Sequence, residues 1–385
     1  MKKIMVLSIG AIFILFVLVG CIHHNENLSE GNYDKKEKKN NIMGKYTMPD
    51  EKEEHEGTWL QWPHDKTYGE GYKESVESIW IEMASELSKG ENVHIIVYDE
   101  FEKEHVYNII NDHSLDMEKI DFYVYPTDDV WVRDNGPIFV YDNKQNLKMM
   151  DWGFNGWGEK TPYKNDILIP SILSKDLGIE RVELHNVVLE GGAIELDGNG
   201  SVLSTRSAVT NSNRNPDLTE EEIEEYLREY YGVSNFIWLD GVAGIDITDF
   251  HIDGFAKFFD GYTIITLKEE DLIEWGVSDK DIEILMNAKN AEGKLYEYIY
   301  LPLSKNNVVL ENGKDLGYKG SYANYYIGNS VVLVPNYNDP NDNIANEIIQ
   351  ELYPKRKVVG IDVRELYQYG GMIHCVTQQQ PVKLK

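Results

Sequence analysis

Apolar residues along the chain occur in short runs that are separated by polar, turn-forming segments. The runs over 92–98 and 121–125 are rich in Val, Ile and aromatic residues, and they predict two buried strands. The segment 74–87 places apolar residues at helical spacing, so it predicts an amphipathic helix before the first of these strands. Strands and helices continue to alternate toward the C-terminus, which predicts an α/β fold.

One order of elements, a hairpin followed by an X-Pro dipeptide, a helix and a strand, occurs twice in the second half of the chain. The first copy comprises the hairpin 192–205, Asn215-Pro216, a helix over 218–230 and a strand over 236–239. The second copy comprises the hairpin 322–334, Asp339-Pro340, a helix over 343–352 and a strand over 357–361. Because repeated units bury their apolar faces against one another, we expect a ring of similar modules whose polar residues meet at a central axis.

The N-terminus has the three regions of an export signal. Two lysines precede an apolar run from Ile4 to Gly20, which ends in Leu-Val-Gly before Cys21. This ending resembles a bacterial lipoprotein box, so we expect residues 1–21 to be a lipoprotein-type signal peptide and Cys21 to carry the lipid. An uncleaved membrane anchor is the alternative, although this run of 17 residues is at the short limit for crossing a bilayer. In either case the protein is expected outside the cytoplasm and attached to a membrane.

The rest of the chain divides into a polar tether and a catalytic domain. Residues 22–42 are rich in Asn, Lys and Glu and contain too little apolar surface to fold, so we expect a disordered tether. Residues 43–385 are expected to form the folded domain. That segment exceeds the usual size of a single hydrophobic core and has no linker rich in Pro, Gly or Ser, which favours one domain of repeated modules.

The formal net charge of −29 limits the class of ligand. An acidic surface repels the phosphates of nucleic acids and attracts cationic molecules, so we expect no nucleic acid partner. Acidity alone is also compatible with a role in solubility.

The chain contains two cysteines, and the signal peptide accounts for Cys21. The other, Cys375, is therefore a lone thiol in the mature protein. Unpaired cysteines are often small buried hydrophobes. Here the preceding Gly370-Gly371 pair, which allows the backbone to approach a ligand closely, favours a reactive group.

Three further segments place carboxylates or imidazoles near predicted strand ends, about one module apart. Trp131 and Asp134 lie at a predicted strand-to-turn junction before Gly136-Pro137, where an Asp that merely caps the turn is the structural alternative. Glu190 ends an apolar run and precedes two glycines. His251 and Asp253 are two residues apart, so on a strand they would face the same side.

One thiol, one imidazole and three carboxylates suggest a narrow class of reactions. His-x-Asp could bind a metal, but no third ligand has metal-site spacing, so we expect neither a metal nor another cofactor. The carboxylates suit a planar cation and the Cys and His suit covalent catalysis with proton transfer. A guanidinium group meets both requirements.

At these residues the chain resembles the agmatine deiminase and bacterial-type peptidylarginine deiminase family of the guanidine-modifying pentein superfamily. The matching motifs follow one another in family order from Met48 to Pro381. They are Met48-Pro49, Glu54-His55-Glu56-Gly57-Thr58-Trp59, Trp62-Pro63, Trp131-Val132-Arg133-Asp134-Asn135-Gly136-Pro137, Phe154-Asn155-Gly156-Trp157-Gly158, Glu190-Gly191-Gly192, His251-Ile252-Asp253, Ser321-Tyr322-Ala323-Asn324 and Ile373-His374-Cys375-Val376-Thr377-Gln378-Gln379. Phe250 and Lys257 stand where Gly and Arg are common in the family. The resemblance implies a five-bladed pseudo-symmetric α/β propeller.

The resemblance also implies roles for the singled-out residues. Cys375 would attack the guanidinium carbon, Asp134 and Asp253 would clamp the guanidinium nitrogens, and Trp131 would pack on the substrate. His251, held by Glu190, would protonate the leaving ammonia and then activate water. Since two carboxylates near the thiol oppose its ionisation, full activation is expected only when a cationic substrate is bound.

The implied activity is hydrolysis of agmatine to N-carbamoylputrescine and ammonia. Deimination of peptidylarginine or free arginine is the alternative within the family. An amidinotransferase, which would pass the same covalent intermediate to an amine, and a non-catalytic lipoprotein that binds cations are the alternatives of other classes. Retention of the Cys, His and carboxylate set together favours an enzyme, because binding alone needs no thiol.

Overall fold

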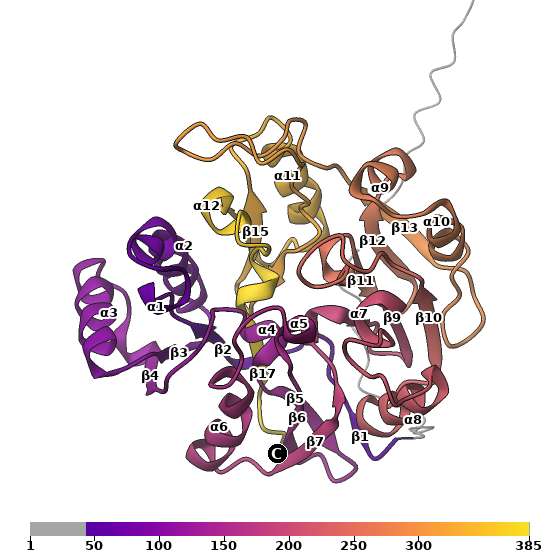
Figure 1. Cartoon of the computed structure of the whole chain (residues 1–385), viewed down its shortest axis with the longest axis horizontal. Helices are drawn as coiled ribbons and strands as arrows, with labels where there is room; N and C mark the ends of the chain where they lie inside the picture. Colours follow the sequence, from indigo (N-terminus) through magenta and orange to yellow (C-terminus); the bar gives the residue numbers. More distant parts are fainter. Residues whose placement is uncertain (1–43, 385) are drawn as a thin grey trace, which may run out of the picture. The chain divides into compact units, whose positions relative to one another are not determined.

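The computed structural model describes residues 44–384, and these are shown in colour in Figure 1. The predicted signal peptide, its Cys21 and the tether over 22–42 lie outside the described residues. Within 44–384, none of the helices combines the length and apolar character that crossing a membrane requires.

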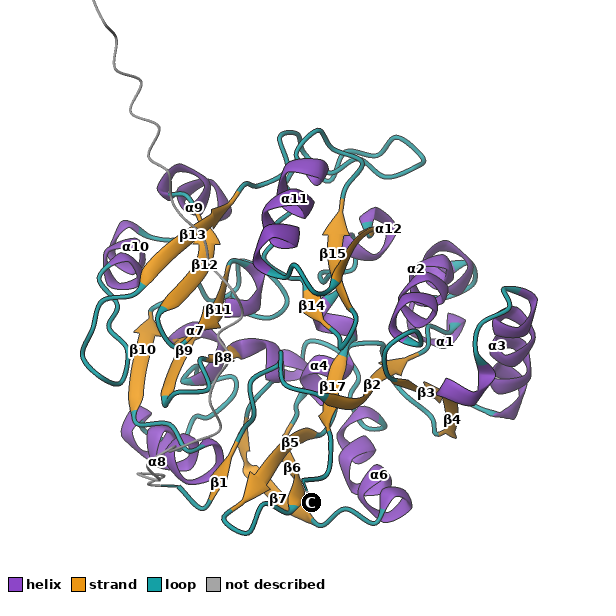
Figure 2. Ribbon diagram, turned by 180° about the vertical axis from the view of Figure 1, so that it is seen from behind, coloured by secondary structure: helices purple, strands orange, loops and turns teal. Residues whose placement is uncertain are grey.

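The described strands form five sheets of three or four strands each. Every sheet contains the same unit, in which a central strand pairs antiparallel with one neighbour and parallel with the other (Figure 2). In the order antiparallel, central, parallel, the units are β5 (Ile138–Asp142), β6 (Leu147–Gly153) and β7 (Arg181–Val188); β8 (Ile194–Leu196), β9 (Ser201–Thr205) and β10 (Asn235–Leu239); β11 (Ala256–Asp260), β12 (Thr263–Leu267) and β13 (Glu297–Leu301); β14 (Tyr326–Ile327), β15 (Val331–Asn336) and β16 (Lys357–Asp362); and β17 (Gln378–Pro381), β2 (His55–Gln61) and β3 (Asn92–Val97). Two edge strands, β1 (Tyr46–Thr47) and β4 (Ile120–Val124), extend the first and last of these sheets.

Helices connect the strands. The α-helices are α1 (Asp65–Tyr68), α2 (Tyr72–Leu87), α3 (Glu100–Asp112), α4 (Val132–Asn135), α5 (Gly156–Glu159), α6 (Ile169–Leu177), α7 (Arg206–Val209), α8 (Glu220–Tyr231), α9 (Glu269–Trp275), α10 (Asp279–Met286), α11 (Asp342–Leu352) and α12 (Arg364–Tyr367). The 3₁₀ turns are η1 (Met117–Lys119), η2 (Asp166–Leu168), η3 (Gly191–Ala193), η4 (Ile252–Gly254) and η5 (His374–Val376). Helix α8 begins at Glu220 because Thr219 and Glu222 form a reciprocal capping box that satisfies two free N–H groups.

Both copies of the repeated unit are present. The first is β8, β9, α8 and β10, and the second is β14, β15, α11 and β16, with the parallel pairing that a helical crossover requires. The prediction of a strand over 322–325 is wrong. Instead of pairing with a strand, Asn324 accepts hydrogen bonds from the backbone N–H of His374, so this segment is drawn toward the C-terminal part of the chain.

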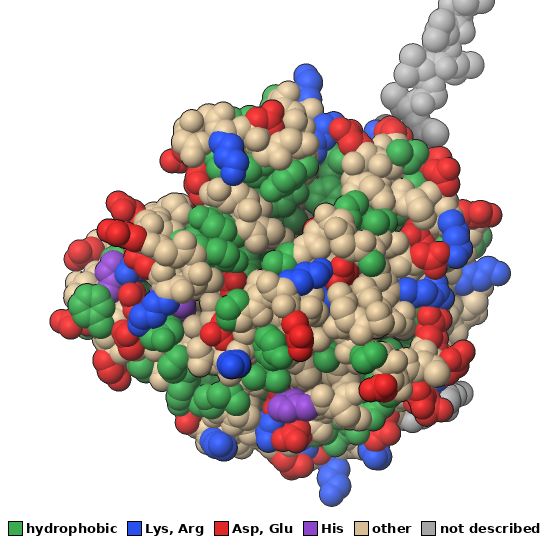
Figure 3. All heavy atoms as spheres, viewed as in Figure 1, with side chains coloured by type: hydrophobic (Ala, Val, Ile, Leu, Met, Phe, Trp, Pro, Cys, Tyr) green, Lys and Arg blue, Asp and Glu red, His purple; other side chains and the backbone are tan. Residues whose placement is uncertain are grey.

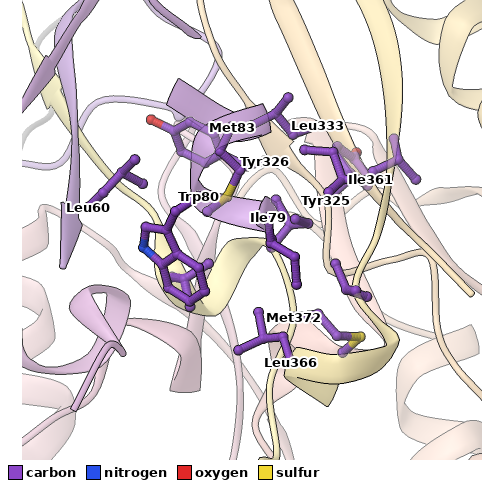
Figure 4. Packing of buried hydrophobic residues seen from close by; sticks show 14 of the residues in the cluster. Leu60, Ile79, Trp80, Met83, Tyr325, Tyr326, Leu333, Ile361, Leu366 and Met372 are labelled. Atoms are coloured by element: carbon purple, nitrogen blue, oxygen red, sulfur yellow. The ribbon is translucent and has the colours of Figure 1, made fainter. Parts of the chain in front are cut away.

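The largest core joins the two ends of the described chain. Leu60 of β2 and Trp80 of α2 pack in the same buried cluster as Tyr326, Leu333 and Met372 from the C-terminal third (Figure 4). Because β17 also pairs with β2, the fifth three-stranded unit is assembled from both ends of the domain.

The four predicted site segments occupy the same place in their sheets, just before the strand that pairs antiparallel in its unit. Helix α4 precedes β5, η3 precedes β8, η4 precedes β11, and η5 precedes β17. In the remaining unit, β14–β15–β16, the segment that contains Asn324 precedes β14. Contacts join α4 to η3 and η5, and η3 to η4, so the repeat brings residues far apart in sequence to one place.

Candidate active site

Gly192 lies where three of the predicted site residues meet. A Cβ atom placed on Gly192 would lie 2.8 Å from Nδ1 of His251, 2.9 Å from Oδ2 of Asp253 and 3.0 Å from Oδ1 of Asp134. Such contacts are too short for a real side chain, so only glycine permits this arrangement. The three side chains are almost completely buried, with exposed fractions between 3% and 7%.

Two local predictions about these segments are wrong. His251 and Asp253 do not lie on a strand, because His251 precedes the 3₁₀ turn η4. Asp134 lies in the short helix α4 and not at the end of a strand. Both segments are helical turns that precede a strand. The side chains therefore meet beside Gly192 through these turns, and not through the alternation of side chains along a strand.

The backbone before His251 is strained. Asp249 and Phe250 have φ values of 62° and 78°, in the left-handed region that costs non-glycine residues on the order of 1–3 kcal/mol each. Hydrogen bonds hold them there: Ser207 Oγ donates to the Asp249 carbonyl, and Thr205 Oγ1 donates to the Phe250 carbonyl. These bonds offset part of the cost of the left-handed conformation at Asp249 and Phe250.

Asp134 is oriented by two donors. The backbone N–H of Gly192 donates to Oδ1 at 3.0 Å, and Nε1 of Trp157 donates to Oδ2 at 2.9 Å. Burial raises the pKa of Asp134, and the nearby carboxylates of Asp253 and Glu190 raise it further, whereas the charge of His251 lowers it. A bound cation would lower the free-energy cost of keeping the Asp134 carboxylate ionised.

His251 lies between carboxylates on two sides. Its Nε2 is 3.2 Å from Oε2 of Glu190, and its Nδ1 is 3.8 Å from Oδ1 of Asp134. Burial alone would lower the pKa of His251, but Asp134, Glu190 and Asp253 outweigh burial and raise it to about 9. The imidazole is therefore protonated at neutral pH.

Asp253 belongs to a buried network of charged and polar side chains. Its Oδ2 lies 2.8 Å from Nδ1 of His374, and the other ring nitrogen of His374 lies 2.8 Å from Glu51 and 3.2 Å from Lys257. Burial would raise the pKa of Asp253, but the hydrogen bond and charge of His374 and the charges of His251 and Lys257 lower it. Lys257 also pairs with Glu195, so its charge is compensated within the network.

Cys375 is partly exposed and lies beside this carboxylate. Its sulfur is 3.9 Å from Oδ2 of Asp253 and 3.4 Å from Nδ2 of Asn324. Burial and the charges of Asp253 and Asp134 raise the pKa of the thiol well above its ordinary value.

Trp131 explains one of the glycines before Cys375. A Cβ atom on Gly371 would lie 2.4 Å from Cζ3 of the Trp131 ring, so the glycine lets the indole approach the segment that contains the thiol. Trp131 itself is 4% exposed.

Four residues near the centre were not assigned a role from the sequence, namely Trp157, Arg214, Asn324 and His374. The repeat contained a signal for Asn324, since it occupies in the β14 unit the place that the other site residues occupy in theirs. Arg214 had no such signal, because it lies in the connection between β9 and β10 and reaches the site only through the fold.

A cavity of about 240 Å³ lies beside the segment before α4. Its lining includes His64, Tyr68 and Asp129 but none of the predicted catalytic residues. Burial raises the pKa of Asp129 to about 7, although Tyr68 donates a hydrogen bond to it. Among residues 44–384, no group of three or more His, Cys, Asp or Glu side chains is arranged to hold a metal ion.

The chain is similar to several known proteins. The family model of Porphyromonas-type peptidyl-arginine deiminase matches residues 47–381. A protein of Latilactobacillus sakei that has been assigned as an agmatine deiminase is 32% identical over 361 residues, which cover 87% of this chain and 96% of that protein.

Solved structures of similar proteins have the same mixed α/β fold. The agmatine deiminase of Enterococcus faecalis, captured while catalysing its reaction, has a TM-score of 0.78 and 28% identity and covers 88% of this chain and 97% of its own. A Porphyromonas gingivalis protein assigned as an arginine deiminase has a TM-score of 0.76 and 32% identity. The match covers 87% of this chain and 98% of that protein. A cysteine-to-serine variant of the C. jejuni agmatine deiminase with substrate bound has a TM-score of 0.75 and 28% identity, covering 88% and 97%.

Proposed function

The chain belongs to the Porphyromonas-type peptidyl-arginine deiminase family, whose members hydrolyse guanidino C–N bonds, and we propose that it acts on agmatine. The products would be N-carbamoylputrescine and ammonia. The observation that carries the proposal is the convergence of Asp134, Asp253 and His251 within 3.0 Å of one point beside a single thiol. Two carboxylates suit the nitrogens of a guanidinium, and the thiol suits attack on its carbon.

The proposed reaction has two halves. Cys375 attacks the guanidinium carbon as a thiolate, and protonated His251 donates its proton to the departing nitrogen, so that ammonia leaves and an amidino-thioether remains. Neutral His251 then takes a proton from water as the water attacks the same carbon. The remaining hydrogen of this water passes to solvent as the C=O bond forms, the C–S bond breaks, sulfur regains its electron pair as a thiolate, and the ureido product leaves. One water is consumed and one ammonia is released.

Occupancy of the site would control the thiol. In the free protein the carboxylates that flank Cys375 disfavour the thiolate. A guanidinium clamped between Asp134 and Asp253 neutralises those charges and adds a positive charge beside the sulfur, which favours ionisation. The nucleophile is thus activated by the substrate that it attacks.

The enclosure of the site favours a small free guanidine over peptidylarginine. Glu190 has no exposed surface, and Asp253, Asp134 and His251 have between 3% and 7%. A peptide substrate carries a backbone on both sides of the reacting side chain and needs an open mouth. The two departures from the family pattern do not oppose this proposal, since Phe250 packs against Phe255 in the core and the charge of Lys257 is paired.

For the fold we propose a five-bladed pseudo-symmetric propeller. The five equivalent three-stranded units and the common position of the site residues ahead of their first strands support it. In such a fold a pseudo-fivefold axis would pass near Gly192.

We also propose that the protein is a lipoprotein of the outer face of a membrane, anchored through Cys21. The charged, apolar and Leu-Val-Gly-Cys regions of residues 1–21 support this location. Acidic side chains are spread over the face of the domain in Figure 3, which suits a cationic substrate better than an anionic surface or nucleic acid. Metabolic labelling with a fatty acid tests the anchor: Cys21→Ala should remove the label, whereas a label that persists would contradict the assignment.

The proposed activity is tested by incubating the purified full-length chain with agmatine, free arginine and a blocked arginyl peptide. We expect ammonia and a ureido product in equal amounts from agmatine. Release of ammonia from none of the three would contradict the proposal, and transfer of the amidino group to an added amine would indicate an amidinotransferase.

A further inference from the structure

We infer that Arg214 is a positioning residue for His251, because it holds both the carboxylate that contacts the imidazole and the turn from which His251 projects. The inference rests on the proposed function for the part that His251 plays in the reaction. The contacts themselves involve only described residues.

The first contact is with Glu190. Nε of Arg214 donates to Oε1 of Glu190 at 2.6 Å, and the other oxygen, Oε2, lies 3.2 Å from Nε2 of His251. Neither side chain of the ion pair has exposed surface. One oxygen of the carboxylate is thus bound to the guanidinium while the other faces the imidazole, so Arg214 fixes the rotation of the carboxylate about its last bond.

The second contact is with the turn before His251. Nη1 of Arg214 donates to Oδ2 of Asp249 at 2.8 Å, and Nη2 donates to the carbonyl of Thr248 at 3.1 Å. Asp249 is one of the two residues held in the left-handed region. Burial opposes its ionisation, but Lys160, Asn213 and Arg214 together lower the pKa of Asp249 to about 2, so the carboxylate stays charged. The guanidinium therefore stabilises the strained backbone that sets the direction of His251.

A third contact reaches the substrate clamp. A Cβ atom on Gly158 would lie 3.0 Å from Nη1 of Arg214, so the loop that contains Gly158 rests directly against the guanidinium. The neighbouring residue in this loop, Trp157, donates to Asp134. Arg214 thus contacts residues that hold His251 and also the loop whose Trp157 holds Asp134. These two site residues come from different modules.

Only arginine can make these contacts together. The planar guanidinium presents several N–H donors in fixed directions, and here it uses three nitrogens on two carboxylates and one carbonyl. A lysine keeps the charge but has a single donor nitrogen, which cannot reach Glu190, Asp249 and the Thr248 carbonyl at once. The substitution Arg214→Lys therefore separates geometry from charge.

Arg206 provides a matched control in the same module. It also bridges two acidic residues, donating to Glu220 and Asp240, but neither of these contacts a predicted catalytic residue. If Arg214 served only to stabilise the module, R214K and R206K would differ in stability but not in the behaviour of His251.

The experiment observes the imidazole N–H proton of His251 by NMR in full-length protein with the Cys375→Ala background, where no turnover occurs. The signal is assigned through its loss in His251→Gln. We expect a protected, downfield N–H signal from the contact with Glu190, its loss or broadening in R214K, and its retention in R206K. An unchanged signal in R214K would overturn the inference. If R214K does not fold, Asp249→Asn weakens the contact of Arg214 with the turn, together with the contacts that Lys160 and Asn213 make with the same carboxylate, and Lys160→Met is the control for these other contacts. Weakening of the His251 signal in Asp249→Asn but not in Lys160→Met supports the inference, whereas an unchanged signal, or equal weakening in both variants, overturns it.

Kinetics with agmatine provide a second readout in the presence of Cys375. R214K should lower kcat roughly tenfold or more while KM changes less than about threefold, because His251 acts in the chemical steps and the clamp carboxylates remain. R206K should change neither. Loss confined to KM, or equal loss in both variants, would overturn the inference. If the unsubstituted chain does not consume agmatine, the proposed function fails, and the NMR comparison still decides the role of Arg214.

Discussion

The sulfur of Cys375 lies 3.9 Å from Oδ2 of Asp253, a carboxylate whose pKa is held below its usual range by His374, His251 and Lys257 against the effect of burial. The nucleophile of the proposed reaction thus faces a negative charge when the site is empty. In the proposed mechanism, a guanidinium bound beside both groups would favour the thiolate. The arrangement links the chemistry of the thiol to recognition of the substrate.

This relationship predicts a gain of thiol reactivity on loss of the carboxylate. Asp253→Asn should raise the rate at which iodoacetamide alkylates Cys375 at mildly alkaline pH, because removing the charge lowers the pKa of the thiol. Mass spectrometry of the labelled peptide measures the rate. Asp112→Asn, a change of an exposed residue in α3, should leave the rate unchanged. A rate in Asp253→Asn at or below that of the unsubstituted protein would contradict the electrostatic argument.

The nucleophile itself is tested by Cys375→Ala. Turnover of agmatine should fall on the order of 10⁴-fold or more, while binding measured by calorimetry persists because Asp134 and Asp253 remain. In quenched reactions of the unsubstituted protein, mass spectrometry should detect an amidino adduct on Cys375 and on no other residue. Substantial activity in Cys375→Ala would exclude the assignment.

The pH dependence of the reaction follows from the raised pKa of His251. The protonated imidazole is needed when ammonia leaves, so kcat/KM should fall as the pH rises through about 9 and His251 loses its proton. Glu190→Gln removes one of the charges that stabilise the imidazolium, so the same decline should occur at lower pH. A pH–rate profile of both proteins measures the shift, and a decline that stays in place or moves to higher pH would contradict the role of Glu190.

Gly192→Ala should abolish most of the activity. The added methyl would occupy the point at which His251, Asp253 and Asp134 meet, and displacement of reacting groups by about 1 Å can cost roughly 100-fold in rate. Gly254→Ala is a matched control, because a Cβ atom there would meet nothing closer than 3.4 Å, from the Trp275 ring. Steady-state rates of the two variants, checked for folding by circular dichroism, should differ by that factor. Equal rates would mean that the site tolerates rearrangement.

Much of this arrangement could be predicted from the sequence because the fold repeats. The X-Pro, helix and strand order at 215–239 and 339–361 identified two modules, and both have the predicted connectivity. The repeat also implied that residues one module apart would converge, and the structure brings Asp134, Glu190, His251 and Asp253 together around Gly192. Their catalytic roles remain predictions.

The local backbone of the site and the partners of its side chains could not be predicted, because they depend on long-range contacts that leave no local pattern in the sequence. His251 and Asp253 were expected to share the face of a strand, but the left-handed backbone at Asp249 and Phe250 redirects the chain into a 3₁₀ turn. The local sequence does not predict that turn, because side chains from other segments hold it. The partner of Glu190 is Arg214, 24 residues away, and the network behind Asp253 reaches back to Glu51.

The central claim, that the site serves a small free guanidine, is tested most directly by kcat/KM for agmatine against a blocked arginyl peptide on the same purified full-length protein. The burial of the carboxylates and the imidazole predicts a preference for agmatine, because a small free guanidine carries no flanking peptide backbone that the site must admit. A preference for the peptide of tenfold or more, equivalent to about 1.4 kcal/mol of transition-state stabilisation, would contradict the claim and indicate a peptidylarginine deiminase.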